Sequence, residues 1–139
     1  MRISEVMKRD VATISADANL VEAATLMRTR NIGFLPVLEE NKVAGVITDR
    51  DIVIRSICQD RSPLSTKVYD IMTPASIWCY DEDVLTDAAK ILAGHHIRRL
   101  LVFNSQKELV GLLSLDDLAV KMSSDRLLGN VLRQVTAAV

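Results

Sequence analysis

Two short motifs of this chain contain the residue types that a polar ligand needs. Thr48 and Asp51 follow a glycine and two aliphatic residues, and Ser114 and Asp117 stand in the same arrangement later in the chain. A hydroxyl side chain followed three positions later by an acid is typical of a helix cap. A helix start also attracts phosphate, and a carboxylate can accept hydrogen bonds from a ribose diol. One copy alone leaves capping and ligand binding open, and the recurrence of both polar positions favours the ligand.

No pattern typical of catalysis or of metal binding is present in the sequence. It lacks a G-x-S-x-G nucleophile motif, a P-loop and the glycine fingerprint of dinucleotide-binding folds. His95 and His96 are adjacent, so their rings do not share one helical face as paired metal ligands usually do. We therefore expect no enzymatic activity, no catalytic residue, no metal site and no required cofactor.

The elements that must position the two motifs are themselves duplicated. Seven apolar residues of the first half recur at an offset of 65 in the second half: Met7, Leu20, Ala23, Ala24, Ile32, Leu35 and Val37. A fixed offset over many positions indicates two copies of one structural unit. A copy of about 60 residues is marginally stable alone, so we expect the two copies to share a core.

Each copy is predicted to run helix, strand, helix, strand, strand, helix, from apolar periodicity and from capping and turn residues. The predicted helices are 3–7, 20–30, 49–58, 84–94 and 115–122, and the predicted strands are 12–15, 34–38, 43–48, 77–80, 99–103 and 109–114.

The predicted domain boundaries follow the duplication. The first copy covers residues 1–60 and the second covers residues 67–122, and residues 59–66 have the composition of a linker. Residues 123–139 form a C-terminal extension that either docks on its own chain or joins two chains. Its predicted helix has five apolar residues on one face: Leu127, Leu128, Val131, Leu132 and Val135.

Composition limits the classes of partner. The chain has 139 residues, of which 49% are hydrophobic and 25% charged, and its formal net charge is −1. Because both signs are mixed, neither a nucleic-acid-binding face nor a membrane-surface patch is indicated. No apolar run reaches the roughly 18 residues of a membrane span, and no signal peptide opens the chain. Two cysteines without CxxC spacing indicate no disulfide framework, so we expect a cytoplasmic protein.

The order, spacing and duplication of several short motifs give the chain a family resemblance. In the first copy these are Met7-Lys-Arg-Asp-Val, Ile32-Gly-Phe-Leu-Pro-Val37 and Gly45-Val-Ile-Thr-Asp-Arg-Asp-Ile-Val53. In the second copy they are Ile71-Met-Thr-Pro74, His96-Ile-Arg-Arg-Leu-Leu-Val102 and Gly111-Leu-Leu-Ser-Leu-Asp-Asp-Leu118. Residues 1 to about 122 thus resemble a tandem pair of cystathionine-β-synthase (CBS) domains, the Bateman module, and in particular the stand-alone bacterial CBS pairs. The resemblance implies an α+β fold of two β-α-β-β-α repeats, packed as an intramolecular pseudo-twofold dimer.

The resemblance also implies a function, which is regulation by a bound adenosine compound (AMP, ADP, ATP, an NAD-type dinucleotide or S-adenosylmethionine) in clefts between the repeats. Asp51 and Asp117 match the ribose-binding acid of the family, and Thr48 and Ser114 match its phosphate-side hydroxyl. The other implied ligand residues lie on the strand edges, on the first-strand walls and beside the acid: Thr13, Ser15, Ala16, Ile32, Gly33, Phe34, Leu35, Pro36, Arg50, Trp78, Tyr80, Ile97, Arg98, Arg99 and Leu100.

Signalling would proceed by a conformational change that a homodimer partner or a regulated protein detects. The alternative is a structural or protein-interaction module that binds no ligand.

The two copies differ at the implied site. Arg98 and Arg99 replace Gly33 and Phe34, so they either clamp the phosphates of a ligand or pair with surface acids. Trp78 stands where the first copy has a threonine, and it either stacks on a base or fills the site. We expect the two copies to differ in occupancy.

Overall fold

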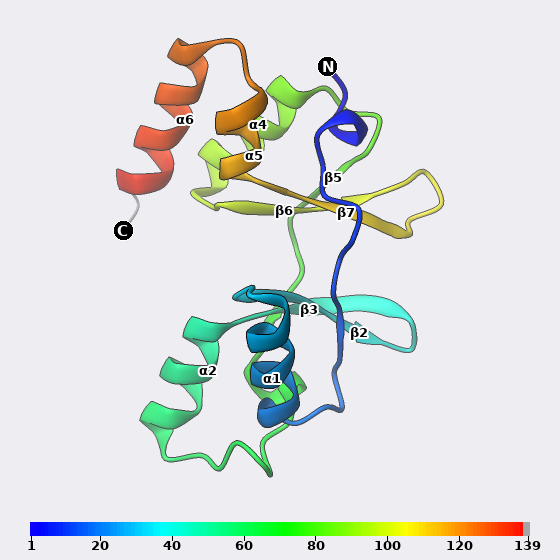
Figure 1. Ribbon diagram of the computed structural model, residues 1–139, viewed down its shortest axis with the longest axis vertical. Coiled ribbons are helices and arrows are strands. Elements are labelled where there is room, and N and C mark those ends of the chain that lie inside the picture. The colour runs from blue at the N-terminus through cyan, green and yellow to red at the C-terminus, as the bar shows by residue number, and fades with distance from the viewer. Residues whose placement is uncertain (138–139) are drawn as a thin grey trace. The chain divides into compact units, whose positions relative to one another are not determined.

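The computed structural model describes residues 1–137, which divide into two compact units (Figure 1). The central unit is Ala12–Ser76, and the terminal unit combines Met1–Val11 with the chain from Ile77 onward. Each unit has one sheet, and its helices lie on one face of that sheet. The predicted α+β class is confirmed.

The central unit has a four-stranded sheet in the order β1-β2-β3-β4. β1 pairs with β2 in parallel, and the other pairs are antiparallel. The elements in chain order are β1 (Ile14–Ser15), α1 (Leu20–Arg30), β2 (Phe34–Glu39), β3 (Lys42–Thr48), α2 (Asp49–Arg55), a 3₁₀ turn (Ile57–Gln59), α3 (Val68–Ile71) and β4 (Thr73–Pro74).

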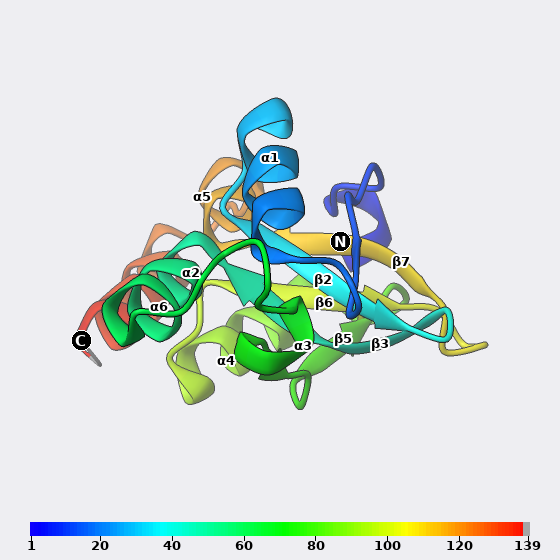
Figure 2. The ribbon, with the colours of Figure 1, turned by 90° about the horizontal axis from the view of Figure 1, so that it is seen from below.

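The terminal unit has a three-stranded sheet in the order β5-β6-β7, again with a parallel first pair. Figure 2 shows its β6–β7 hairpin and the β2–β3 hairpin of the central unit. The elements in chain order are a 3₁₀ turn (Ile3–Glu5), β5 (Trp78–Tyr80), α4 (Leu85–His95), β6 (Arg99–Phe103), β7 (Leu109–Ser114), α5 (Leu115–Lys121) and α6 (Asp125–Ala137).

Local signals explain where α1 begins and where α1 and α4 end. Asn19 caps α1 by accepting from the N–H of Glu22, and Glu22 accepts from the N–H of Asn19 in return. Asn31 ends α1 and His96 ends α4, both in the left-handed conformation. Asparagine and histidine tolerate this conformation better than most residues, so the chain can turn directly into the next strand.

The buried apolar side chains form two clusters, one in each unit. Leu20, Leu35 and Ile47 are central to the first cluster. Leu92, Leu100 and Leu113 have the same role in the second. Each cluster also contains apolar residues of the other copy, Val68 and Ile71 in the first and Ile3 and Met7 in the second. The two copies therefore share apolar packing as expected, but in two clusters and not in one core.

The compact units do not follow the predicted boundaries 1–60 and 67–122, because each copy contributes its first segment to the other unit. Lys8 exchanges backbone hydrogen bonds of 2.9 Å with Leu112 of β7. In the same way, Thr73 and Pro74 pair with Val46 and Gly45 of β3. Sequence repetition does not reveal which copy a segment packs against.

Residues 59–66 are not a linker between the compact units, because they lie inside the central unit. The N–H of Leu20 approaches the carbonyls of Pro63 (3.1 Å) and Thr66 (3.2 Å). The hydroxyl of Thr66 donates to the carbonyl of Ser62 at 2.7 Å, and Thr66 is buried. The segment thus closes over the start of α1.

The C-terminal helix α6 docks on its own chain, which is one of the two predicted roles of the extension. It packs against α4 and α5, with Val131 and Val135 buried in the core of the terminal unit. Nδ1 of His96 lies 3.0 Å from the carbonyl oxygen of Gln134. Leu132 is 47% exposed and so does not share the buried face, contrary to prediction. Residues 138–139 of the predicted extension lie outside the described residues.

Within residues 1–137, no helix is both long enough and apolar enough to cross a membrane.

Candidate functional site

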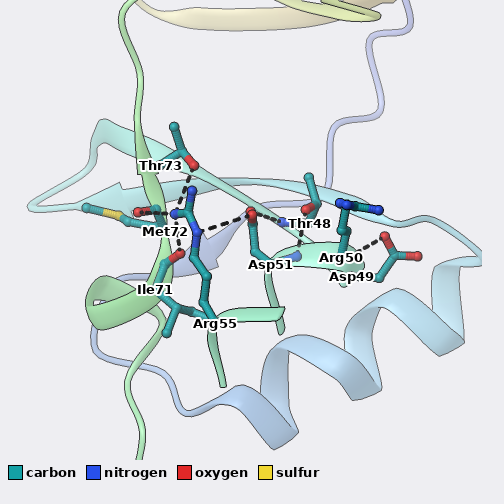
Figure 3. Close-up of polar contacts among 8 residues, drawn as sticks. All are labelled: Thr48, Asp49, Arg50, Asp51, Arg55, Ile71, Met72 and Thr73. Atoms are coloured by element: carbon teal, nitrogen blue, oxygen red, sulfur yellow. Dashed lines mark hydrogen bonds and ion pairs between the residues drawn. The ribbon is translucent and has the colours of Figure 1, made fainter. Parts of the chain in front are cut away.

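The turn from β3 into α2 positions the first motif of the central unit. Thr48 caps α2, since its Oγ1 accepts from the N–H of Asp51 at 3.1 Å. Oδ2 of Asp51 accepts from the N–H of Thr48 at 3.0 Å in return (Figure 3). This is the reciprocal capping box that the spacing of hydroxyl and acid favours. Capping uses one carboxylate oxygen of Asp51 and leaves the other, Oδ1, for a second partner.

That second partner is Arg55, which the sequence analysis did not single out. Its Nε lies 3.8 Å from Oδ1 of Asp51. Nη1 of Arg55 also donates to the carbonyls of Ile71 and Met72 and to the hydroxyl of Thr73. The side chain of Asp51 is 17% exposed and that of Arg55 is 49% exposed, so the ion pair opens to solvent on the arginine side. The four-residue spacing on a helix was the available signal.

The second motif has the same capping geometry in the terminal unit. Oγ of Ser114 accepts from the N–H of Asp117 at 3.2 Å, and Oδ2 of Asp117 accepts from the N–H of Ser114 at 2.8 Å. The Ser114 hydroxyl also donates to that Oδ2 at 2.8 Å. Oδ1 of Asp117 lies 4.0 Å from Nζ of Lys8, and the Asp117 side chain is 14% exposed. Both motifs therefore present one carboxylate oxygen to a cation.

In each unit the structure brings the predicted strand edge to its motif. Phe34 pairs with Thr48, and Arg99 pairs with Ser114. The N–H of Asp49, the first residue of α2, donates to the carbonyl of Gly33 at 3.1 Å. In the same way, the N–H of Leu115 donates to the carbonyl of Arg98 at 2.9 Å. These residues and the acids form one contiguous site in each unit.

Gly33 lies close to the exposed side chain of Asp49, which would have to move aside for a larger residue. A Cβ atom at Gly33 would lie 2.7 Å from Oδ2 of Asp49. The terminal unit has Arg98 and Leu115 at the corresponding positions, so no carboxylate occupies that space. The exchange of Gly33 for Arg98 is therefore accompanied by the exchange of Asp49 for Leu115.

The first-strand walls lie further along the strands than the motifs do. Ile14 pairs with Val37 and Ser15 with Leu38, which are three and four residues beyond Phe34. At about 3.3 Å per residue, Ser15 is separated from the Thr48 region by roughly 13 Å along the sheet. Oγ of Ser15 accepts from the N–H of Asp17. In the central unit, Ser15 therefore stands apart from the capping box.

On the terminal wall, Trp78 pairs with Leu101 and Tyr80 with Phe103. Both Trp78 and Tyr80 are exposed, and the ring of Trp78 meets the ring of Phe103 edge to face, with centroids 5.9 Å apart. Trp78 thus has one partner in its own unit and an accessible surface, so stacking on a base and filling of the site both stay open.

The remaining predicted residues differ in exposure. Arg50, Arg98 and Arg99 are exposed, as is Ile32, whereas Ile97 and Thr13 are half-buried. The side chains of Ala16, Leu35, Pro36 and Leu100 are buried, so they support the site rather than line it.

Arg98 and Arg99 are adjacent at the start of β6. Because side chains alternate between the faces of a strand, two neighbouring arginines do not point the same way. Leu100 points into the core, so Arg99 lies on the opposite face of β6. At a single ligand we therefore expect one of the two guanidinium groups to make direct contact.

The cysteines and potential metal ligands make no further site in residues 1–137. No group of three or more His, Cys, Asp or Glu side chains there could hold a metal ion. Cys58 is exposed, and Cys79 is buried with its thiol 3.7 Å from the carbonyl of Leu101. Burial, aided by the negative charge of Asp83, raises the pKa of Cys79 to about 12. Its thiol stays protonated at neutral pH.

Comparison with known proteins finds the same domain twice in this chain. The family model described as CBS domain matches residues 3–57 and 68–124. The chain is 36% identical over 134 residues to the CBS domain-containing protein YhcV of Bacillus subtilis, covering 96% of this chain and 94% of that protein.

Solved structures agree on the fold. A putative signal-transduction protein with CBS domains from Burkholderia ambifaria has a TM-score of 0.79 and 26% identity, covering 91% of this chain and 96% of that one. The CBS domain pair of protein MJ0100, solved with 5′-methylthioadenosine and S-adenosyl-L-methionine, has a TM-score of 0.76 and 21% identity, covering 86% of this chain and 94% of that one.

Proposed function

Because this chain belongs to the CBS domain family and carries the domain twice, we propose that it is a regulatory module that binds an adenosine-containing nucleotide. AMP, ADP, ATP and NAD-type dinucleotides have the required ribose diol. Binding shifts the conformation of the module, and a second copy or a regulated protein partner detects the shift. The module makes and breaks no covalent bond itself.

The observation that supports this proposal is made in both units. One carboxylate oxygen of the acid accepts the capping hydrogen bond, and the other faces a cation. In both units Oδ2 serves the helix cap, whereas Oδ1 meets only a partly exposed cation. A ribose diol has two O–H donors that suit such an oxygen. A cap alone needs one carboxylate oxygen, and no capping rule accounts for the second cation-paired oxygen in both units.

Phosphate groups would bind beside the acid rather than on the helix start. The first turn of α2 carries Asp49 and Asp51, and that of α5 carries Asp116 and Asp117. These carboxylates oppose an anion at the helix start. We propose that the exposed arginines beside each motif receive the phosphates: Arg50 in the central unit and Arg98 or Arg99 in the terminal unit.

The MJ0100 pair indicates that the fold can hold adenosine compounds, since it was solved with two of them. At 21% identity that likeness concerns the fold and selects no ligand for this chain. The choice among nucleotides therefore requires a binding experiment.

A thermal-shift panel tests the proposal. A ligand at 100 times its dissociation constant adds about 2.7 kcal/mol of stability, a shift that a melt resolves. We expect AMP, ATP or NAD to stabilise the wild-type chain, and expect the Asp51→Asn, Asp117→Asn double variant to lose that stabilisation. Asp49→Asn, in the same helix turn as Asp51, serves as the matched control and keeps it. If none of these nucleotides stabilised the wild-type chain, the proposal would be refuted.

A protein-interaction module is the second candidate, and one surface of the central unit favours it. A groove of about 310 Å³ lies between α1 and α2 and the 59–66 segment. Its lining is mostly apolar and includes Val21, Ile57 and Pro63. Homodimer formation through such a surface, detected by sedimentation and abolished by Ile57→Glu, together with a nucleotide-insensitive melt, would favour this second function.

A further inference from the structure

Arg55 joins three parts of the central unit from its position at the end of α2. Its Nε faces Oδ1 of Asp51, while Nη1 lies 3.0 Å from the carbonyl oxygen of Ile71, 3.2 Å from Oγ1 of Thr73 and 3.5 Å from the carbonyl oxygen of Met72. Figure 3 shows the guanidinium between the acid on one side and the 71–73 backbone on the other. One side chain thus links the candidate diol-binding acid to the end of α3 and the start of β4.

The segment that Arg55 holds has few other bonds. β4 is a two-residue edge strand, and its Pro74 has no N–H to donate. The N–H of Ala75 reaches the carbonyl of Ala44 only at 3.4 Å. Hydrogen bonds from a charged donor are about twice as strong as neutral ones, so Arg55 adds to what the burial of Ile71 and the pairing of β4 with β3 already contribute to fixing residues 71–75. The central unit ends directly after this segment, at Ser76.

The terminal unit has no such link. Lys121 stands four residues after Asp117, as Arg55 stands after Asp51, and its side chain makes no hydrogen bond or ion pair with any residue of 1–137. Lys8 occupies the place of Thr73 and meets Asp117 directly. The three-way link is therefore a property of the central unit.

We propose that Arg55 is a positioning residue that couples ligand binding at Asp51 to the 71–75 segment. This inference rests on the proposed function, because the ligand group concerned is the ribose diol. A diol that donates to Oδ1 of Asp51 competes with Nε of Arg55 for the same oxygen. The guanidinium is a rigid plane, so Nη1 moves when Nε moves. Ligand binding therefore loosens the 71–75 segment, which is the part of the central unit that leads out of it.

Amide hydrogen exchange of the full chain measures this loosening at Met72 and Ala75, whose N–H groups donate to Val68 and Ala44. The probes are AMP and 2′-deoxy-AMP, which have the same charge and differ only in the diol. Losing a partly exposed ion pair changes an opening equilibrium constant by a factor of about five at most. We therefore expect AMP to raise the exchange rate of these amides by up to about fivefold. At equal occupancy, 2′-deoxy-AMP should raise it less.

Three variants separate coupling from mere structural support. Arg55→Gln should raise exchange at residues 72–75 without ligand, and AMP should add nothing further. Arg55→Lys keeps a positive charge beside Asp51 but lacks the planar guanidinium that reaches Asp51 and residues 71–73 at once. It should therefore raise exchange at residues 72–75 without ligand, as Arg55→Gln does. Lys121→Gln is the matched control from the terminal unit and should change neither exchange nor binding.

Calorimetry on the same proteins gives a second, independent readout. In the wild type the diol must displace Arg55, whereas in Arg55→Gln it need not. The ratio of AMP affinity to 2′-deoxy-AMP affinity should therefore rise in Arg55→Gln, by about threefold for a surface ion pair. A purely structural Arg55 would leave this ratio unchanged or lower it.

Two results would overturn the coupling alone: AMP bound without a change in exchange at residues 72–75, or Arg55→Gln exchanging like the wild type without ligand. No binding of AMP, ATP or NAD to the wild type would instead overturn the proposed function, and the coupling with it.

Discussion

In the central unit the capping acid, Asp51, meets an arginine from its own helix, whereas in the terminal unit Asp117 meets a lysine from the N-terminal segment of the chain. The capping boxes around the two acids are nearly superposable in their hydrogen bonds. Two things differ: the position in the chain of the cation, which is distant in sequence only for Asp117, and the use of the hydroxyl within the capping box. Ser114 donates its hydroxyl to Asp117, whereas the Thr48 hydroxyl only accepts from the Asp51 N–H. The comparison shows that local sequence determines the cap and that packing determines what the acid can still bind.

This difference predicts which of the two sites binds the nucleotide more tightly. Oδ2 of Asp117 receives two donors from Ser114, while Oδ2 of Asp51 receives one from Thr48. The Thr48 hydroxyl proton remains able to serve a ligand. We therefore expect the central unit to bind the nucleotide more tightly than the terminal unit.

The largest expected contrast between the units concerns their cysteines. With a pKa of about 12 against an ordinary 9.0, Cys79 has about a thousandfold less thiolate than an unperturbed thiol at pH 8. A thiol reagent should modify the exposed Cys58 at least a hundredfold faster than Cys79, as peptide mass spectrometry can measure. Because the raised pKa belongs to the folded state, its contribution to stability is complete below pH 9 and is lost as pH rises toward 12. Equal labelling of both thiols in the folded chain would contradict the burial of Cys79.

The second contrast concerns Gly45 and Gly111, the glycines against which the first segment of the other copy packs. Substituting them by alanine should cost different amounts of stability. A Cβ at Gly45 would lie 2.5 Å from the backbone carbonyl oxygen of Thr73, whereas one at Gly111 would lie 2.5 Å from Sδ of Met7 and 3.0 Å from the backbone carbonyl oxygen of Lys8. Overpacking costs typically 1–3 kcal/mol, so we expect about 3 kcal/mol for Gly45→Ala and about 1 kcal/mol for Gly111→Ala. Urea denaturation of both variants measures this. If Gly111→Ala proved the more destabilising, the account of how β4 is admitted would be wrong.

The third contrast concerns α6, which packs on α4 in the terminal unit and has no counterpart in the central unit. Val131 is buried against α4, so Val131→Ala should cost about 2 kcal/mol of unfolding free energy. The neighbouring Leu132 is half-exposed, and Leu132→Ala should cost about 0.5 kcal/mol or less. A larger loss for Leu132→Ala in thermal melts at low protein concentration would indicate that its side chain is covered in solution.

The smallest effect concerns the arginines that only the terminal unit has. Replacing Arg98 and Arg99 together by alanine should weaken AMP at the terminal site by about tenfold and leave adenosine almost unaffected, since charge-assisted bonds are lost only with phosphate. The penalty should shrink as salt increases. Calorimetry in the Asp51→Asn background isolates this site. Equal losses for adenosine and AMP would make the arginines structural supports.

The sequence predicted those features whose causes are local. The predicted bounds of α1 are confirmed, because a capping asparagine and an apolar face mark the helix. β6 and β7 were also predicted exactly, since polar residues bound each apolar run. The reciprocal caps at Thr48 and Ser114 followed from residue spacing alone.

Features that depend on distant partners were missed or misassigned. The pattern expected for each copy implies a first helix in the second copy, and α3 stands there, although no range was predicted for it. The two-residue β4 was missed, because it is recognised only by its pairing with the distant β3. The 59–66 segment has a linker composition, yet it closes over α1 by backbone hydrogen bonds. Arg55 was overlooked because most of its partners, residues 71–73, lie sixteen or more positions away.

Calorimetric titration of AMP into the full chain and its Asp51→Asn and Asp117→Asn variants tests the central claim most directly. Loss of hydrogen bonds to a carboxylate costs about 1.5–3 kcal/mol, so Asp51→Asn should weaken the tighter of two binding events by about 10- to 100-fold. Asp117→Asn should affect only the weaker event, and both variants should keep the wild-type stability within about 1 kcal/mol. Unchanged affinity for both events in both variants would show that neither acid receives the ribose.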